Sequence, residues 1–326
     1  MKEMYPFVFN PLLKEKIWGG GVIRSFKGLS PNDVKTGESW ELSCMQGDYS
    51  VVANGTMEGK TIDKLIVRYG EKLLGSNVFQ QFGTTFPLLT KFIDAHENLS
   101  VQVHPDDELA QKRHQSFGKT EMWYVVKAAP GAALYSGFSH QIDKEAYLHR
   151  IEDGSIMEVL HRYEVKAGDV FFLPAGRVHA LGAGCFVAEI QQTSDLTYRI
   201  YDYKRKDTNG NNRQLHTQLA KDAIDYTVYP DYRTIYTPKP NQVVPLVQCK
   251  YFTANLLALD TTMERNYSAI DSFVIYICME GKATLRDNNK YELTVKQGQT
   301  ILIPAETQHI TIITEPNLKL IETYVI

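Results

Sequence analysis

The chain has 326 residues, which is enough for one large domain or two ordinary ones. Hydrophobic residues make up 43% of it and charged residues 22%, the composition of a globular protein with an ample core, and no apolar run approaches the roughly 20 residues of a membrane span. The formal net charge of -3 argues against binding to nucleic acid, although local basic groups could still bind a small anion.

The N-terminus and the cysteines indicate the compartment. The first five residues contain no apolar signal segment. Cys44, Cys185, Cys249 and Cys278 lie far apart and lack the paired spacing of a metal-binding motif, which is typical of reduced thiols in a core. We therefore expect a cytoplasmic protein with no membrane partner.

The first part of the chain combines strands with one helix. Residues 37–43 are strand-like, with Glu38 and Trp40 on one face. Apolar residues recur at helical spacing over residues 61–74, which predicts a helix. Residues 86–93 predict a buried strand that leads into the stretch with the clearest chemistry.

Polar and apolar residues alternate from Leu99 to Val103, which predicts a strand with one polar face. Side chains two positions apart on a strand point the same way, so Gln102 and His104 are expected to face the same space. Pro105 ends the strand because it cannot donate a ladder hydrogen bond. An imidazole beside an amide oxygen can hold a divalent ion if one or two further ligands lie nearby.

Two further candidate ligands lie downstream. Glu121 stands at the start of a predicted strand, and His179 follows another strand and a turn that contains proline and glycine. A histidine by itself is more often a core residue than a ligand, but the combination favours a metal site. Because Gln102, His104, Glu121 and His179 come from three separate strands or strand ends, a β-barrel is the natural way to bring them together.

The remaining predicted elements are mostly strands. Short helices are predicted over 106–114 and 143–150, a solvated loop over 204–213, a helical insert over 215–226 and a linker over 229–240. The strands are predicted over residues 123–127, 132–135, 157–163, 169–173, 185–191 and 197–201.

The segment 168–179 recurs as 298–309, with glycine, proline, alanine and histidine all at the same offset. Its form, Gly-Asp-x4-Pro-x-Gly-x2-His, resembles the second motif of the cupin jelly roll. No His-x-His pair and no glutamate at the strand start precede the second copy, so His309 is expected to lack ligand partners. We predict a mainly β fold of two cupin-like jelly-roll barrels: a catalytic domain at 1–228 and a metal-free domain at 241–326.

Two basic residues lie near the predicted ligands. Lys119 is two positions before Glu121, and Arg199 lies on the strand predicted over 197–201. Arg199 is either a clamp for an anion or one half of a buried ion pair with Asp195 or Asp202, and the spacing does not decide between them.

Four motifs follow one another along the chain: Gln-Val-His-Pro-Asp-Asp, Gly-Lys-Thr-Glu-Met-Trp-Tyr, Pro-Ala-Gly-Arg-Val-His-Ala and Ser-Asp-Leu-Thr-Tyr-Arg-Ile-Tyr-Asp. Together they resemble the type I phosphomannose isomerases of the cupin superfamily, in the shorter bacterial form. Ile-Trp-Gly-Gly, Glu-Ser-Trp-Glu-Leu-Ser and Phe-Pro-Leu-Leu-Thr-Lys-Phe support this, and the resemblance extends to about residue 226.

The resemblance implies interconversion of mannose 6-phosphate and fructose 6-phosphate with one zinc ion per chain. It places the zinc ligands on Gln102, His104, Glu121 and His179. It also implies catalytic roles for Arg199 and Lys119, and contacts to the sugar phosphate from Trp18, Ser100, Lys119 and Arg205.

The implied chemistry moves a proton from C2 of the open-chain aldose to C1 through an enediolate, whose charge zinc and Arg199 can stabilise. Lys119, Glu189 and Glu41 all remain candidates for the base. A non-catalytic sugar-phosphate-binding or regulatory cupin is the alternative, which the presence of Arg199 and Lys119 disfavours. A cupin dioxygenase is a third possibility, disfavoured because Gln102 replaces the first histidine of the usual His-x-His pair. The sequence predicts no oligomeric state.

Overall fold

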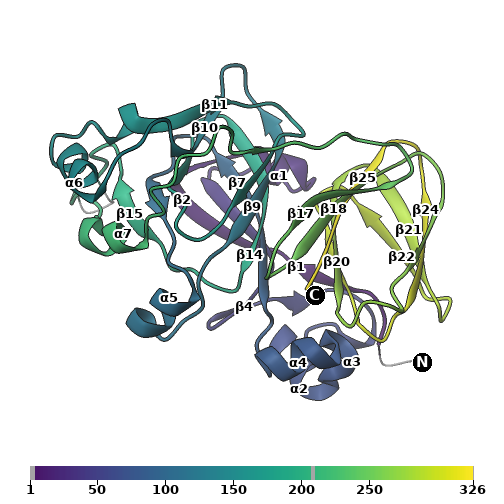
Figure 1. The fold of residues 1–326 in the computed structure, drawn as a ribbon. Helices are drawn as coiled ribbons and strands as arrows, with labels where there is room; N and C mark the ends of the chain where they lie inside the picture. The colour runs from purple at the N-terminus through teal and green to yellow at the C-terminus, as the bar shows by residue number, and fades with distance from the viewer. Residues whose placement is uncertain (1–3, 207–209, 326) are drawn as a thin grey trace.

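The computed structural model describes residues 4–206 and 210–325, which form two β-sandwich units side by side (Figure 1). Each unit has one large and one small sheet. The fold is mainly β and cupin-like, as predicted. The predicted barrels are, however, open sandwiches, because the edge strands of the two sheets in a unit are not hydrogen-bonded to one another.

The N-terminal unit contains two antiparallel sheets. The large N-terminal sheet has, in spatial order, β16 (Arg233–Thr234), β12 (Val170–Leu173), β9 (Glu121–Ala128), β14 (Cys185–Gln192), β7 (Leu88–Ala95), β3 (Thr36–Leu42) and β2 (Leu12–Gly20). The small N-terminal sheet has β11 (Leu160–Glu164), β10 (Ala133–Phe138), β13 (His179–Leu181), β8 (Val101–Val103) and β15 (Tyr198–Tyr201).

The C-terminal unit repeats this arrangement. The large C-terminal sheet has β17 (Val243–Gln248), β18 (Thr253–Leu259), β25 (Leu318–Tyr324), β20 (Val274–Glu280), β23 (Thr300–Ile303), β1 (Phe7–Asn10) and β6 (Val51–Val52). The small C-terminal sheet has β19 (Met263–Asn266), β24 (His309–Thr314), β21 (Lys282–Asp287) and β22 (Glu292–Lys296). The N-terminal strand β1 thus pairs with β23 far along the chain, so the two units share a sheet. The division at 1–228 and 241–326 stays a prediction.

Helices are short and lie outside the sheets. They are α1 (Val22–Phe26), α2 (Ile62–Tyr69), α3 (Glu71–Leu74), α4 (Ser76–Phe82), α5 (Asp107–His114), α6 (Lys144–Glu152), α7 (Thr217–Ala223) and the 3₁₀ turns η1 (Gly55–Met57) and η2 (Ile156–Val159). A separate small hairpin consists of β4 (Cys44–Met45) and β5 (Asp48–Tyr49). In the described part of the chain no helix is long and apolar enough to cross a membrane.

The helix predictions hold in location but differ in detail. Asp106 and Asp143 cap α5 and α6, each accepting a hydrogen bond from a backbone N–H three residues on, which explains where those helices begin. The helix predicted over 61–74 is broken into α2 and α3 because Gly70 adopts a positive φ of 50°. The predicted insert is present as α7. Of the loop predicted over 204–213, residues 207–209 lie outside the described residues.

The central strand β9 of the large N-terminal sheet carries apolar side chains on both faces, because both faces of the sheet are covered. On β9, Trp123 and Val125 belong to the core shared with the small N-terminal sheet. Met122 and Tyr124, which alternate with them, belong to a second core that includes residues of the C-terminal unit. The molecule is therefore built in four layers, with the two large sheets in the middle.

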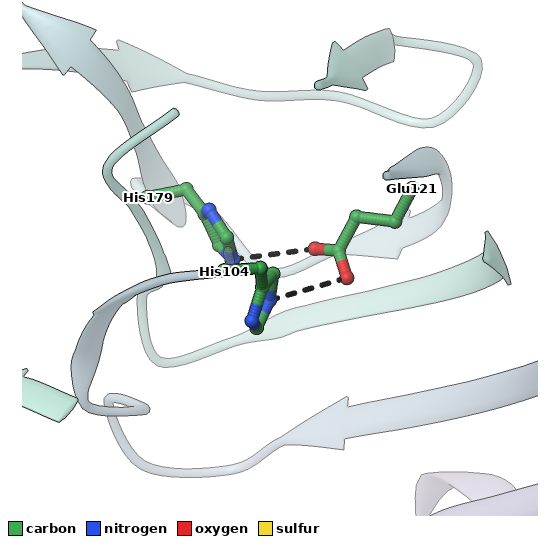
Figure 2. Close-up of side chains that lie close together, drawn as sticks. All are labelled: His104, Glu121 and His179. Atoms are coloured by element: carbon green, nitrogen blue, oxygen red, sulfur yellow. Dashed lines mark ion pairs between the residues drawn. The ribbon is translucent and has the colours of Figure 1, made fainter. Parts of the chain in front are cut away.

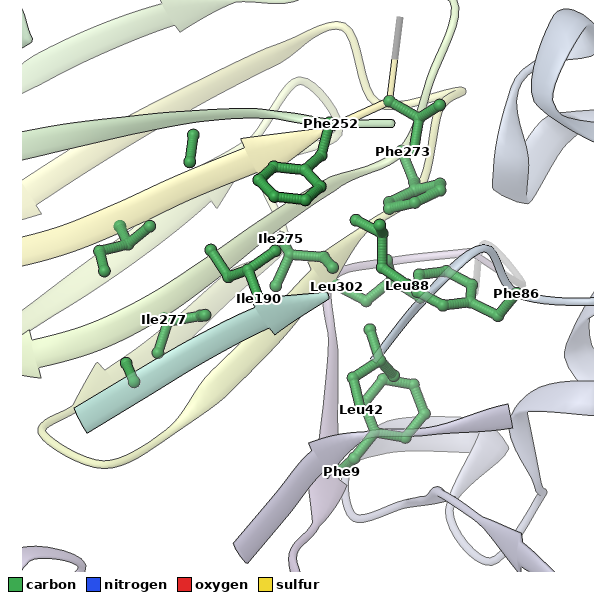
Figure 3. Packing of buried hydrophobic residues seen from close by; sticks show 14 of the residues in the cluster. Phe9, Leu42, Phe86, Leu88, Ile190, Phe252, Phe273, Ile275, Ile277 and Leu302 are labelled. Atoms are coloured by element: carbon green, nitrogen blue, oxygen red, sulfur yellow. The ribbon is translucent and has the colours of Figure 1, made fainter. Parts of the chain in front are cut away.

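The central core holds the two units together (Figure 3). Leu88 and Ile190 from the large N-terminal sheet share it with Ile275 from the large C-terminal sheet. Phe86 and Phe273 also meet there, with ring centroids 4.4 Å apart. Each such buried side chain contributes roughly 1.5–3 kcal/mol by leaving water. This packing fixes the outer face of the sheet whose inner face carries the site.

The repeated segments have the same strand–turn–strand form. Gly168 and Gly298 both have positive φ, and His179 and His309 open β13 and β24. The two histidines nevertheless differ in surroundings, because His179 is buried and His309 is exposed. In β24 it is the following residue, Ile310, that enters the core. The same motif therefore presents its histidine to opposite faces of the two units.

Candidate metal centre and active site

Three buried side chains converge inside the N-terminal unit from different strands (Figure 2). His104 follows β8, Glu121 opens β9 and His179 opens β13. The Nε2 atom of His104 lies 3.4 Å from Oε2 of Glu121, and the Nε2 atom of His179 lies 3.2 Å from Oε1. The small sheet supplies the two imidazoles and the large sheet supplies the carboxylate, so the cluster exists only because the sheets face each other.

The outward nitrogens of the two imidazoles fix their orientation. Nδ1 of His104 donates to the carbonyl oxygen of Leu196 at 2.8 Å, and Nδ1 of His179 donates to that of Arg177 at 2.8 Å. With the proton on Nδ1, each Nε2 carries a lone pair that points toward the cluster. Both Nε2 atoms and both oxygens of Glu121 are buried and form no hydrogen bond, although one of the oxygens is ion-paired with Lys119. Nitrogen and oxygen atoms with free lone pairs in this arrangement can act as ligands of a metal ion at their centre.

The charges of the cluster also suit a cation. Burial, together with Lys119, lowers the pKa of His104 to about 3, and burial lowers the pKa of His179. Both imidazoles are therefore neutral near pH 7. Burial opposes ionisation of Glu121, but the ammonium of Lys119, 3.1 Å away, holds the pKa of this carboxyl well below its usual range. Two neutral imidazoles and one carboxylate form a donor set typical of zinc.

Gln102 lies beside this cluster by strand register. It is directly opposite His179 of β13 on one side and Arg199 of β15 on the other. Opposed residues of antiparallel strands share a face, so these three side chains face the interior of the unit. The predicted polar face of the strand with Gln102 and His104 is therefore the face that carries the site.

A cavity of about 270 Å³ opens beside the cluster. Its lining includes the predicted residues Trp18, Ser100, Gln102, Lys119, Glu189 and Arg199. Lysine and arginine side chains supply much of the remaining wall, from Lys16, Lys91 and Arg213. Against these five basic side chains the wall has three acidic ones, so the cavity carries an excess of positive charge that suits a small anionic ligand.

Lys119 and Glu189 both belong to this wall, and their environments act on their pKa values in different ways. Burial would lower the pKa of Lys119, but the carboxylates of Glu121, Glu189 and Asp195 raise it above its ordinary value. Burial raises the pKa of Glu189, and the negative charge of Glu121 raises it further. One oxygen of Glu189 accepts a hydrogen bond from Nε1 of Trp123 at 2.7 Å, whereas the other is buried without one.

Arg199 has no carboxylate partner among residues 4–206 and 210–325. Asp202 is paired with Arg205 and Arg213 instead, the latter at 3.2 Å. The guanidinium of Arg199 donates to the carbonyl oxygen of Gln214 at 2.9 Å, and its Nε atom is buried with no partner. The ion pair considered from the sequence is thus absent from the described chain, which leaves Arg199 available to an anion.

Comparisons with known proteins agree with this geometry. Residues 7–125 match a family model described as the catalytic domain of type I phosphomannose isomerase, and residues 243–325 match one described as the cupin domain of mannose-6-phosphate isomerase. Mannose-6-phosphate isomerase ManA of Bacillus subtilis is 36% identical over 302 residues, which cover 92% of this chain and 93% of that protein. The chain belongs to the type I phosphomannose isomerase family.

Other relatives extend this comparison. Mannose-6-phosphate isomerase of Streptococcus mutans is 32% identical over 300 residues, with 92% of each chain covered. The crystal structure of mannose 6-phosphate isomerase from Bacillus subtilis superposes with a TM-score of 0.88 at 33% identity and covers 99% of this chain and 100% of that one. Phosphomannose isomerase from Salmonella typhimurium has a TM-score of 0.79 at 15% identity, covering 98% and 99%, a likeness of fold.

For this type I phosphomannose isomerase, two predicted residues lie away from the cavity. Arg205 forms an ion pair with Asp202 and stacks near Tyr203, with its guanidinium carbon 5.5 Å from the ring centroid. Its assignment as a phosphate contact stays a prediction. Glu41, a candidate base, is paired at 2.8 Å with Lys27. Glu41 alternates with Glu38 and Trp40 along β3 and lies on the other face of the strand.

Other residues of the cavity wall were missed by sequence reasoning. Lys16, Glu38 and Lys91 belong to β2, β3 and β7, and Glu38 lies 3.2 Å from Lys16. Burial opposes ionisation of Glu38, but Lys91 and Lys16 lower its pKa to about 2. The alternation of Glu38 with Trp40 correctly placed these two on one face, and Lys91 lies directly opposite Trp40. A charged residue on the inward face of each of three adjacent strands is the signal that could have identified them.

A second hollow of about 560 Å³ lies between the two units, beside the linker. Ile235 and Tyr236 of the linker, Tyr124 of β9 and Met279 of β20 contribute to its lining. It contains none of the predicted site residues. The chemistry of this family member therefore belongs to the smaller cavity, where the titratable groups converge.

Proposed function

We propose that this protein is a zinc-dependent aldose–ketose isomerase that interconverts mannose 6-phosphate and fructose 6-phosphate. The observation that carries the proposal is the buried cluster of His104, Glu121 and His179, which lies behind a cavity whose wall includes Gln102 and Lys119, the latter 3.1 Å from Glu121. Membership of the type I phosphomannose isomerase family, with relatives named for this activity, supports the choice of substrate.

One Zn²⁺ would be held by Gln102, His104, Glu121 and His179. The two free Nε2 atoms and the carboxylate oxygens support this assignment, and the position of Gln102 opposite His179 supports the fourth ligand. When bound, the ion supplies a net positive charge that polarises a carbonyl or hydroxyl oxygen of the sugar.

Arg199 would face the charge that develops during the reaction. Removal of the C2 proton from the open-chain aldose leaves an enediolate with its negative charge on the C1 oxygen. Transfer of the C2 hydroxyl proton to that oxygen moves the charge to the C2 oxygen, and return of a proton to C1 then gives the ketose. A guanidinium with a buried, unpartnered Nε atom in the cavity wall can donate to such an oxygen. Because this donor is held in place before the reaction, little reorganisation accompanies the charge as it forms.

Glu189 is the base that the cavity favours among the three candidates. Its carboxylate is anchored through one oxygen by Trp123, and the other buried oxygen accepts no hydrogen bond but lies 3.4 Å from Nζ of Lys91, which keeps it in the cavity wall. The raised pKa of Glu189 makes it a better proton acceptor than an ordinary carboxylate, and the same group can return the proton to C1. Lys119 is ion-paired with Glu121 and would bind a substrate oxygen. Glu41 is engaged by Lys27.

The phosphate would lie toward the arginines of the cavity. Arg213 lines the cavity with Arg199 and can bind phosphate through two parallel hydrogen bonds. Arg205, which is also ion-paired with Asp202, remains the phosphate contact predicted from the sequence. Trp18 and Ser100, which also line the cavity, would contact the sugar. The ligand is a small sugar phosphate, and the proposal requires neither nucleic acid nor a membrane.

The C-terminal unit, at 241–326, would carry no metal, and the catalytic unit would comprise 1–228. The exposed position of His309 supports a structural role for the repeat. A cytoplasmic location is supported by the cysteines, since Cys44, Cys185, Cys249 and Cys278 are all free thiols.

The proposal is tested by incubating the purified protein with mannose 6-phosphate and measuring fructose 6-phosphate in a coupled assay. We expect turnover with one equivalent of zinc bound. A folded, zinc-loaded protein that binds the sugar phosphate without converting it would instead be a non-catalytic cupin, and the proposed activity would be wrong.

A further inference from the structure

A short segment lies along the free edge of the strand that carries Arg199. In the small N-terminal sheet β15 is an edge strand, paired on one side with β8. On its other side, the backbone N–H of Arg199 donates to Nδ1 of His216 at 3.0 Å. The backbone N–H of His216 donates to the carbonyl oxygen of Arg199 at 2.7 Å. The guanidinium of Arg199 donates to the carbonyl oxygen of Gln214. Residues 214–216 thus bind both backbone polar groups and the side chain of one residue.

These contacts determine how Arg199 faces its neighbour. Its N–H and C=O both point to His216, so the pair that it forms with Gln102 of β8 is not hydrogen-bonded. In antiparallel sheets such pairs have the closest side chains. The contact with His216 therefore holds Arg199 beside a predicted zinc ligand on the cavity face.

His216 is suited to this contact because its imidazole is neutral. Burial lowers its pKa, and the positive charges of Arg199 and, when protonated, His114 of α5 lower it further. A neutral Nδ1 can accept the hydrogen bond from the backbone of Arg199, with the ring proton on Nε2. His216 also precedes α7, yet its side chain makes no capping hydrogen bond to that helix.

The segment itself is held by the helices. Arg113 near the end of α5 donates to the carbonyl oxygen of Leu219 in α7 at 3.2 Å and is ion-paired with Asp222. Arg113 and its partner Asp222 together add little net charge near His216. The helix that directly follows His216 is thus held by contacts outside the cavity.

We propose that His216 is a positioning residue for the isomerisation, whose Nδ1 holds the backbone of Arg199 so that the guanidinium meets the charge formed on the substrate. This inference rests on the proposed role of Arg199. It requires an acceptor at the position of Nδ1, and it requires neither the bulk nor the basicity of the imidazole.

Two substitutions separate the acceptor from the side-chain bulk. His216→Leu keeps much of the bulk but removes the acceptor, whereas His216→Asn places Oδ1 as many bonds from Cα as Nδ1. We expect His216→Leu to lower kcat about tenfold or more, with a smaller change in KM, because the loss of one hydrogen bond displaces a group that acts in the transition state. His216→Asn should stay within about threefold of the parent. His149→Leu, at a side chain 76% exposed on α6, is the matched control and should have no effect.

A double-mutant cycle tests whether His216 acts through Arg199. In an Arg199→Ala background, His216→Leu should lower kcat by less than about twofold further, because the group that it positions is absent. Equal effects of His216→Leu in both backgrounds would overturn the inference, as would equal losses in His216→Leu and His216→Asn. If Arg199→Ala itself retains full turnover in a folded, zinc-loaded protein, the proposed role of Arg199 fails. If Arg199→Ala is slow and His216→Leu is not, only the positioning role of His216 fails.

Discussion

Replacement of Arg199 by lysine separates charge from geometry at the proposed site of charge stabilisation. Lysine keeps the positive charge but loses the planar set of donors, including the buried Nε atom that has no partner in the protein. One preorganised donor of this kind typically contributes a factor of about 10² to 10³ in turnover, or roughly 3–4 kcal/mol of the barrier. We therefore expect kcat of Arg199→Lys to fall by about two orders of magnitude or more.

The same substitution should have a small effect on stability. Within residues 4–206 and 210–325 Arg199 forms no ion pair, and its side chain donates one hydrogen bond, to Gln214. Loss of one such hydrogen bond costs about 1–2 kcal/mol of unfolding free energy, whereas breaking a buried ion pair costs about 3–5 kcal/mol. Turnover, zinc content and urea unfolding are measured on one preparation. Near-normal turnover in a folded, zinc-loaded Arg199→Ala protein would refute the assignment, and so would a loss of turnover that merely follows the unfolded fraction.

Three further predictions concern the cluster, the base and the cavity wall. His104→Ala and His179→Ala should each lose stoichiometric zinc by elemental analysis, because each removes a neutral Nε2 donor, whereas His309→Ala should retain it. Glu189→Gln should lower kcat by about 10² to 10⁴ with little change in KM, because it removes the proton acceptor and keeps the shape. Glu38→Gln should lower the unfolding free energy by about 3 kcal/mol or less near pH 7, since the pKa of Glu38 is about 2 in the folded protein against an ordinary 4.5.

The effect of Glu38→Gln on the unfolding free energy should depend on pH in a definite direction. A lowered folded-state pKa contributes stability that is fully present above pH 4.5 and is lost as the pH falls toward 2. The difference in unfolding free energy between the parent and Glu38→Gln should therefore shrink below pH 4.5 in urea unfolding, and a difference that is constant across this range would contradict the assigned ionisation.

For the base, unchanged turnover of Glu189→Gln would leave Lys119 as the remaining cavity candidate. For the metal, zinc retained by both histidine variants would exclude the site.

The fold and the convergence of His104, Glu121 and His179 could be predicted because their signals are local. The alternation around Gln102 and His104 defined the polar face of a strand, and Asp106 marked the start of the helix that follows. The break at Gly70 was missed because helical spacing continues through it, while the backbone there has a positive φ. The open sandwiches were also missed, since the closure of a sheet depends on pairing between its edges, which no single strand reveals.

The cavity wall was harder to predict because it depends on pairings across the molecule. Arg213 lies in a stretch expected to be a solvated loop, yet its ion pair with Asp202 brings it to the cavity. His179 and His309 stand at the same position of one motif but face opposite environments. The contact between His216 and Arg199 joins residues 17 positions apart whose spacing carries no signal. Such features follow from tertiary packing, which local propensity does not encode.

The most direct test of the account is a coupled assay for fructose 6-phosphate formed from mannose 6-phosphate, run on the protein as purified, after removal of metal with a chelator, and after return of one equivalent of zinc. The account predicts turnover in the first sample, its loss in the second with the fold retained by circular dichroism, and its recovery in the third. Full turnover by protein shown to be metal-free by elemental analysis would contradict the central claim.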